Sequence, residues 1–300
     1  MASVAPINPA SSYWRRLALP RHDALAVAGV LACAVLAFVG CALAGLSFNP
    51  PLRLIVLMPA LIGSLALLYH MWRPAENRLF QILLYAALWA LLPSAGTQLS
   101  FLVQLAQMPL QSEFYTAMDH AIGFVWIDWA RFVMARPWLE WITRQAYLSY
   151  AAQPYVALIL IALLGRGTRN ARLIIAAMIT LAITIVVSGL IPATEPAHAY
   201  GFKTPAWDAV AALRGGQRSG LPYIGIICFP SFHAAMAVLF TAAFRGMPRC
   251  FWPFAALNAV MLLSVPFSGD HYLVDFLAGI AVAGLAVWLS GKIVPEPAAT

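Results

Sequence analysis

Long apolar runs fill most of this 300-residue chain and constrain its fold more than any other feature. Hydrophobic residues make up 62% of the sequence and charged residues only 10%, whereas a soluble domain usually carries about 25% charged residues. A membrane-spanning helix needs about 20 predominantly apolar residues. The sequence therefore predicts an all-α, polytopic transmembrane helical bundle of about eight spans: Ala24–Leu46, Leu54–Trp72, Leu79–Val103, Ala146–Leu164, Leu173–Ile191, Ser231–Phe244, Phe251–Phe267 and Tyr272–Leu289.

Basic residues between the runs indicate the orientation of the chain. If the N-terminus is cytoplasmic, the cytoplasmic segments hold eleven of the 18 Lys and Arg residues, and every short loop agrees with the positive-inside rule. Both termini are then cytoplasmic. Because the formal charge of +7 is spread over short clusters, no nucleic-acid partner is expected. The eleven residues are Arg15, Arg16, Arg21, Arg73, Arg78, Arg166, Arg169, Arg172, Arg245, Arg249 and Lys292.

Two long segments fall on the outer side in this topology. Residues 104–145 mix tryptophan with charged side chains, which is typical of amphipathic helices at the membrane interface. A soluble amphipathic lid is the alternative interpretation. Residues 192–230 are rich in Gly and Pro and contain Lys203, Arg214 and Arg218. The four cysteines show no disulfide or metal-ligand spacing and are interpreted as small apolar side chains.

Two short motifs at the outer face carry the candidate chemistry. Phe229-Pro230-Ser231-Phe232-His233 opens the sixth predicted span, and Gly269-Asp270-His271-Tyr272-Leu273-Val274-Asp275 opens the eighth. On a helix, His271 and Asp275 would share one side. The carboxylate would then accept the imidazole N–H and leave the other ring nitrogen free as a base or nucleophile. Asp270 is expected to cap this helix.

The first motif adds a second imidazole, that of His233, and a helix N-terminus at Ser231. Free backbone N–H groups and the helix dipole at this position favour an anion such as phosphate. Each feature has an ordinary explanation when taken singly: a hydrogen-bonded structural histidine, a helix cap, or a proton relay. Their combination on one face of the membrane predicts phosphoryl transfer.

These motifs resemble the type 2 phosphatidic acid phosphatase superfamily, whose members share Pro-Ser-x-His and His-x-x-x-Asp. The matching residues are Pro230–His233 and His271–Asp275. Within the superfamily, Ile191-Pro192-Ala193-Thr194 and Asp119-His120-Ala121-Ile122-Gly123-Phe124 are similar to the aureobasidin-resistance branch, which contains inositol phosphorylceramide synthase. The resemblance covers residues 111–290.

The resemblance implies a role for each motif residue. His271 resembles the nucleophile that takes the phosphoryl group, Asp275 its orienting carboxylate, and His233 the general acid for the leaving oxygen. Ser231 resembles a phosphate ligand, and Asp270 is expected to take part in substrate binding. The family's scheme needs no metal and no cofactor.

The chain departs from the phosphatase members in lacking their upstream Lys-x6-Arg-Pro motif and the Arg six residues before the second histidine, where Val265 stands. The phosphate charge must then be balanced by other groups. Lys203, Arg214 and Arg218 are the candidates, and the alternative is that they are ordinary solvated loop charges.

The sequence thus predicts spans and a tail over residues 1–110, a catalytic membrane core over 111–291 and a cytoplasmic tail over 292–300. The expected activity is transfer of a phosphoryl-linked headgroup between membrane lipids, with a lipid or polyol acceptor. A lipid phosphate phosphatase and a proton-coupled transporter are the alternatives. The expected location is a bacterial inner membrane, with the active site facing away from the cytoplasm.

Overall fold

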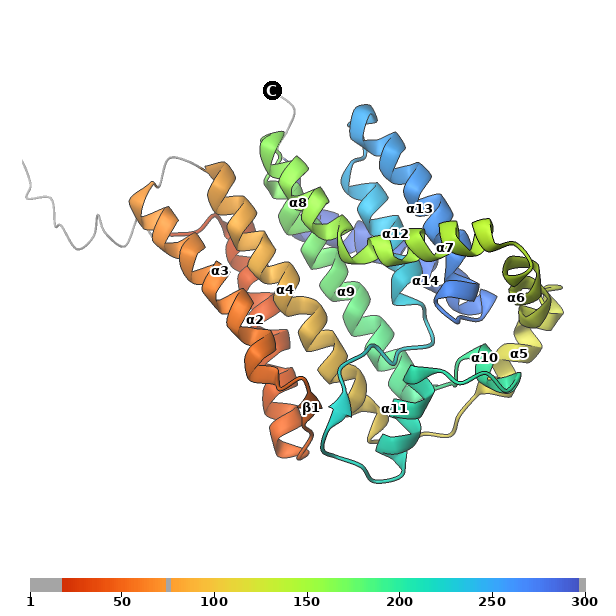
Figure 1. The fold of residues 1–300 in the computed structure, drawn as a ribbon. Helices are drawn as coiled ribbons and strands as arrows, with labels where there is room; N and C mark the ends of the chain where they lie inside the picture. The colour runs from red at the N-terminus through yellow and green to blue at the C-terminus, as the bar shows by residue number, and fades with distance from the viewer. Residues whose placement is uncertain (1–17, 74–76, 297–300) are drawn as a thin grey trace, which may run out of the picture.

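The computed structural model describes residues 18–73 and 77–296, so Arg15, Arg16 and the end of the C-terminal tail lie outside the described residues. The fold is all-α, as predicted (Figure 1). Its helices are α2 (Arg21–Leu43), α3 (Leu52–Trp72), α4 (Asn77–Gln104), α5 (Ser112–Ala121), α6 (Trp126–Met134), α7 (Pro137–Leu148), α8 (Gln153–Leu163), α9 (Thr168–Leu190), α10 (Pro196–Ala199), α11 (Pro205–Arg214), α12 (Phe232–Ala243), α13 (Pro248–Ser268) and α14 (Leu273–Ile293).

Among the described residues, six helices are long and apolar enough to cross a membrane: α2, α3, α4, α9, α13 and α14. A seventh span is formed if α7 and α8, which meet at a bend of 57°, are taken together. The remaining predicted span, Ser231–Phe244, corresponds to α12, a shorter apolar helix. Helix α12 has 12 residues and measures about 18 Å, against a bilayer core of about 30 Å.

The main core lies where α4, α8, α9, α12 and α14 meet. Apolar side chains such as Leu92, Ile174 and Phe240 are fully buried there. The polar side chains Ser94 and Gln98 of α4 are also buried, as expected for polar groups that lipid could not satisfy. Helix α12 packs against α9, α13 and α14, so its N-terminal motif is held by three longer helices.

The N-terminal helices α2 and α3 pack on the opposite side of α4 (Figure 1). A buried carboxylate joins two of them: Asp23 of α2 accepts hydrogen bonds from Gln81 at 2.8 Å and from Tyr85 at 2.6 Å, both on α4. At the far end, β1 (Phe48–Asn49) pairs in parallel with β2 (Leu221–Pro222). This pairing ties the loop after α2 to the segment that leads into α12.

The segment after α4 folds into α5, α6 and α7, and it is anchored to the bundle. Trp126 is buried and donates a hydrogen bond to the carbonyl of Pro266 at 2.6 Å. Helix α7 packs along α13. Trp138 and Trp141 of α7 are exposed, which fits the predicted interfacial helices.

Candidate active site

The two sequence motifs meet at the N-terminal ends of α12 and α14. Ser231 is the N-cap of α12, where its Oγ accepts the N–H of Ala234 at 3.2 Å. Its own N–H donates to the carbonyl of Asp275 at 3.0 Å. Gly279 permits this approach, since a Cβ there would lie 2.3 Å from the carbonyl oxygen of Ser231.

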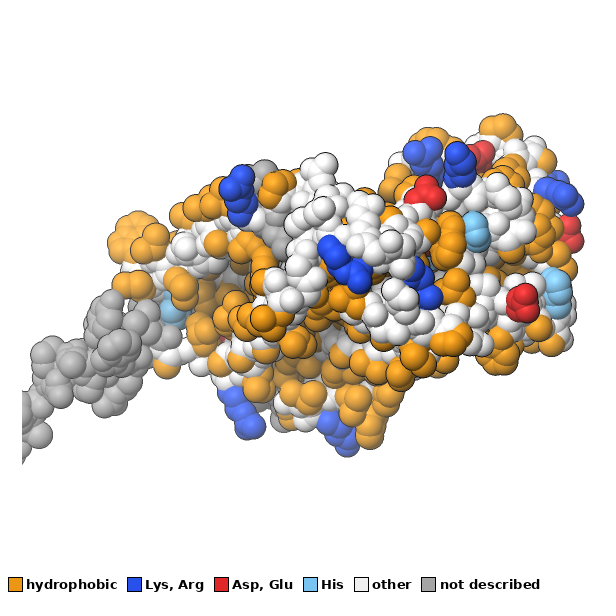
Figure 2. All heavy atoms as spheres, turned by 90° about the horizontal axis from the view of Figure 1, so that it is seen from below, with side chains coloured by type: hydrophobic (Ala, Val, Ile, Leu, Met, Phe, Trp, Pro, Cys, Tyr) orange, Lys and Arg blue, Asp and Glu red, His pale blue; other side chains and the backbone are white. Residues whose placement is uncertain are grey.

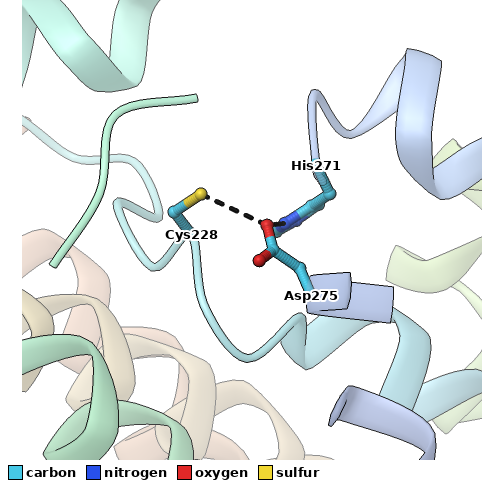
Figure 3. Close-up of side chains that lie close together, drawn as sticks. All are labelled: Cys228, His271 and Asp275. Atoms are coloured by element: carbon cyan, nitrogen blue, oxygen red, sulfur yellow. Dashed lines mark hydrogen bonds and ion pairs between the residues drawn. The ribbon is translucent and has the colours of Figure 1, made fainter. Parts of the chain in front are cut away.

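His271 and Asp275 form a buried pair (Figure 3). Nδ1 of His271 lies 3.3 Å from Oδ2 of Asp275, which leaves Nε2 as the nitrogen available for chemistry. The predicted contact is therefore present, although its predicted basis is wrong. His271 lies in the turn before α14, and Asp275 reaches back to it from the first helical turn.

Oδ2 of Asp275 is the centre of a small hydrogen-bond network. It accepts the backbone N–H of Tyr272 at 3.0 Å and the thiol of Cys228 at 3.3 Å (Figure 3). One ligand atom each from Cys228, His271 and Asp275 lies within 4.8 Å of the others, a spacing that could also hold a metal ion. Because the hydrogen bonds already account for this arrangement, the site's chemistry can be written without a metal.

His233 faces the pair from the first turn of α12. Its ring centroid lies 6.5 Å from that of His271. Its Nδ1 lies 3.1 Å from the hydroxyl of Tyr147, and the two rings stack at 4.5 Å. Helix α7 thus contributes a side chain that orients the second imidazole.

The N-terminus of α14 is capped from another helix. The two carboxylate oxygens of Asp119, on α5, accept the N–H groups of Leu273 and Val274, each at 2.9 Å. The predicted cap by Asp270 is wrong, because Asp270 adopts a left-handed backbone conformation (φ 53°) and its side chain accepts the N–H of Ala197 at 2.9 Å.

Two more carboxyl groups lie beside His271. The pKa of Asp270 is raised to about 7, mainly by burial and to a lesser extent by the negative charge of Glu195. Burial likewise raises the pKa of Glu195, which accepts a hydrogen bond from Thr204 at 3.1 Å. Ionised carboxylates would repel a phosphate anion, and the raised pKa of Asp270 makes that carboxyl mostly neutral below pH 7.

The predicted cations do not contact the histidines among the described residues. Arg214 donates to the carbonyl of Met108 at 2.8 Å, and Arg218 donates to that of Leu213 at 2.8 Å. Lys203 is exposed. Figure 2, a view onto the end of the molecule where α11 lies, shows Lys and Arg in separate small groups with hydrophobic side chains between them. Whether any of these three cations binds substrate stays a prediction.

The start of α12 offers other donors for an anion. The backbone N–H groups of Phe232 and His233 have no acceptor among the residues that the structure describes. They are first-turn groups of a helix, where the dipole favours negative charge. An imidazole oriented by a carboxylate, a second imidazole and free N–H donors are an arrangement that could attack phosphorus.

The structure adds four residues to the site that the sequence motifs did not predict as site residues: Asp119, Tyr147, Glu195 and Cys228. Only Asp119 lay in a stretch already noted for its resemblance to the aureobasidin-resistance branch. The other three come from segments without a motif. Tyr147, for instance, reaches His233 only because α7 folds across α13.

Comparison with known proteins agrees with this geometry. Residues 114–289, more than half of the chain, match the PAP2 superfamily. No curated protein and no solved structure matches the chain. The matched region contains both histidines, Asp275 and all four added residues. The superfamily supports a phosphatase or phosphotransferase activity on lipid phosphates in general terms. The chain belongs to the PAP2 superfamily.

Proposed function

We propose that the protein is an integral membrane lipid phosphotransferase that works through a phosphohistidine on His271. The observation that carries the proposal is the facing pair of imidazoles. One is held by Asp275 at 3.3 Å and the other by Tyr147 at 3.1 Å, with the ring centroids 6.5 Å apart. Each histidine thus has Nδ1 engaged and Nε2 available. As nucleophile, His271 acts with Nε2 unprotonated, and as acid, His233 acts with Nε2 protonated.

In the first step, Nε2 of His271 attacks phosphorus and the bond from phosphorus to the leaving oxygen breaks. His233 donates a proton to that oxygen, while Asp275 stabilises the positive charge that develops on His271. In the second step, an acceptor hydroxyl attacks phosphorus, its proton passes to His233, and the phosphorus–nitrogen bond breaks. His271 and His233 then return to their starting states.

Phosphate oxygens are proposed to accept the free N–H groups of Phe232 and His233. Preorganised donors of this kind stabilise the charge of the transition state. Protonation of Asp270 would lower the opposing negative charge. Arg214 and Arg218 could contribute only after releasing their carbonyl partners, whereas the exposed Lys203 needs no such release.

The similarity to the aureobasidin-resistance branch supports transfer to a lipid or polyol hydroxyl. Hydrolysis by water shares the first step, so the lipid phosphatase remains the second candidate. The deciding assay supplies purified protein with a panel of phospholipids, with and without a polyol or ceramide acceptor. Transfer predicts a headgroup-bearing acceptor product. Release of phosphate alone, whatever the acceptor, would establish the phosphatase instead.

The site is proposed to face away from the cytoplasm, in a bacterial inner membrane. The distribution of short basic loops supports this orientation. A reporter active only outside the cytoplasm should be active when fused after Gly269 and silent after Gly246. The reverse pattern would overturn the orientation.

Proton uptake coupled to solute transport, without lipid turnover, would favour the transporter.

A further inference from the structure

A cavity lies at the end of the bundle opposite the two histidines. It has a volume of about 460 Å³ and is lined by α9, α12 and α14. Its lining includes Val287 and Gly291 near the C-terminal end of α14, whereas Asp275 lies in the first turn of that helix. A helix of 21 residues is about 32 Å long, so this cavity is separate from the candidate active site.

Three arginines give the cavity its charge. Arg169 and Arg172, on α9, are largely buried, with side chains 14% and 24% exposed. Arg245, in the loop after α12, is exposed and completes the lining. Facing these three cations is one acidic side chain of the lining, Glu296. The cavity therefore keeps an excess of positive charge.

The protein's own chain shows that the cavity accepts an anionic group. Oε1 of Glu296 lies 2.9 Å from Nε of Arg169 and 3.1 Å from Nη1 of Arg172. One oxygen is thus shared by two guanidinium groups, an arrangement suited to a phosphate oxygen. Glu296 is 45% exposed and follows the last helix, so it can leave without unfolding any helix.

Most of the other side chains of the wall are apolar. Leu173, Ala176, Leu239 and Val287 line the cavity beside the arginines. A ligand that fills it would combine an anionic head with a hydrocarbon part. We propose that this cavity binds the phosphate headgroup of an anionic membrane lipid, and that Glu296 occupies the headgroup position when no lipid is bound.

The proposal requires competition between Glu296 and the lipid. Removing the carboxylate charge should strengthen lipid binding, because Nε of Arg169 and Nη1 of Arg172 then have no anionic partner. Other nitrogens of the two arginines donate to backbone carbonyls and hold the side chains in place. Removing Arg172 should weaken binding, because it leaves the phosphate with fewer charged donors. The matched control is Arg166, which is exposed on the loop before α9 and does not line the cavity.

The experiment measures binding of phosphatidic acid to the full-length protein in detergent micelles, with phosphatidylcholine and inorganic phosphate as separate arms. The His271→Ala background prevents turnover at the other site. Glu296→Gln should tighten phosphatidic acid binding about tenfold, Arg172→Gln should weaken it about tenfold, and Arg166→Gln should leave it unchanged. Phosphatidylcholine should bind at least tenfold more weakly than phosphatidic acid.

Unchanged or weaker binding in Glu296→Gln would overturn the proposal, and this variant removes a partly exposed charge without touching the core. Inorganic phosphate that binds as tightly as phosphatidic acid would show a simple anion site and overturn the assignment to a lipid. Equal effects of Arg166→Gln and Arg172→Gln would show attraction by general charge rather than by this cavity.

Discussion

The backbone N–H of Ser231 donates to the backbone carbonyl of Asp275 at 3.0 Å. This bond joins the two motifs of the active site directly, independently of either side chain. It forms because Gly279 lets the start of α12 lie against α14, with Ala234 and Ala235 also close. The separation of the two histidines is therefore set by a backbone-to-backbone contact.

Gly279→Ala should abolish activity. The new Cβ would lie 2.3 Å from the carbonyl oxygen of Ser231, so α12 must move and the histidines must separate. The matched control is Gly284→Ala on the same helix, where nothing lies within 4 Å of the added Cβ. Activity and thermal stability in detergent are measured for both. Equal activity in the two variants would show that the contact does not set the site.

Asp119→Ala should lower both stability and kcat. It removes two charge-assisted hydrogen bonds to the N-terminus of α14, a loss of about 2 kcal/mol. We expect kcat to fall about tenfold with little change in KM, because the cap positions Asp275 rather than contacting substrate. Glu113→Ala, an exposed change on the same helix, should have no effect. A change in KM alone would contradict the positioning role.

Tyr147→Phe should slow the step that needs His233 as an acid. The ring stacking is kept and only the bond between the hydroxyl and Nδ1 is lost, worth about 1 kcal/mol. We expect kcat to fall about fivefold for an alkoxide leaving group and little for a nitrophenolate, which needs no proton. Tyr150→Phe is the matched control, because it removes a hydroxyl from another ring that packs against His233, with 4.6 Å between the ring centroids. Equal losses for both leaving groups would contradict the role.

The pKa of Asp270, raised to about 7 chiefly by burial, predicts a pH dependence of KM. Below pH 7 the carboxyl of Asp270 is mostly neutral; above pH 7 its negative charge opposes that of the substrate phosphate. KM for a phosphodiester lipid should therefore rise about three- to tenfold from pH 6 to pH 8. Asp270→Asn should keep a low KM throughout. The same pH profile in both proteins would exclude Asp270 as the cause.

The all-α bundle and the key residues of the site could be predicted because they depend on local patterns. Apolar runs of span length require helices in a bilayer. The spacing of His271 and Asp275 brings them together even though His271 precedes the helix, because Asp275 in the first turn reaches back. The sequence does not predict the break between α7 and α8. The apolar run at Ala146–Leu164 predicts one continuous span, whereas its first residues belong to the amphipathic helix α7.

The contacts that complete the site could not be predicted in this way. Asp119 and Tyr147 form hydrogen bonds with residues far along the chain, at the start of α14 and at His233. The residues adjacent to them in the sequence do not indicate these partners. Asp270 was misassigned because a residue before a helix is usually its cap. Here the left-handed backbone at Asp270 directs its carboxylate to the N–H of Ala197. The carboxylate of Asp119 caps the helix instead.

The most direct test of the account is to trap the phosphoenzyme. Wild-type protein given a labelled phospholipid and quenched during turnover should carry an acid-labile, base-stable phosphohistidine that maps to His271. His271→Ala should show neither label nor turnover, and Asp275→Asn should form the label about 10²- to 10⁴-fold more slowly, because the amide does not stabilise the imidazolium. Label on His233, or no label while turnover is fast, would contradict the assignment of His271 as the nucleophile.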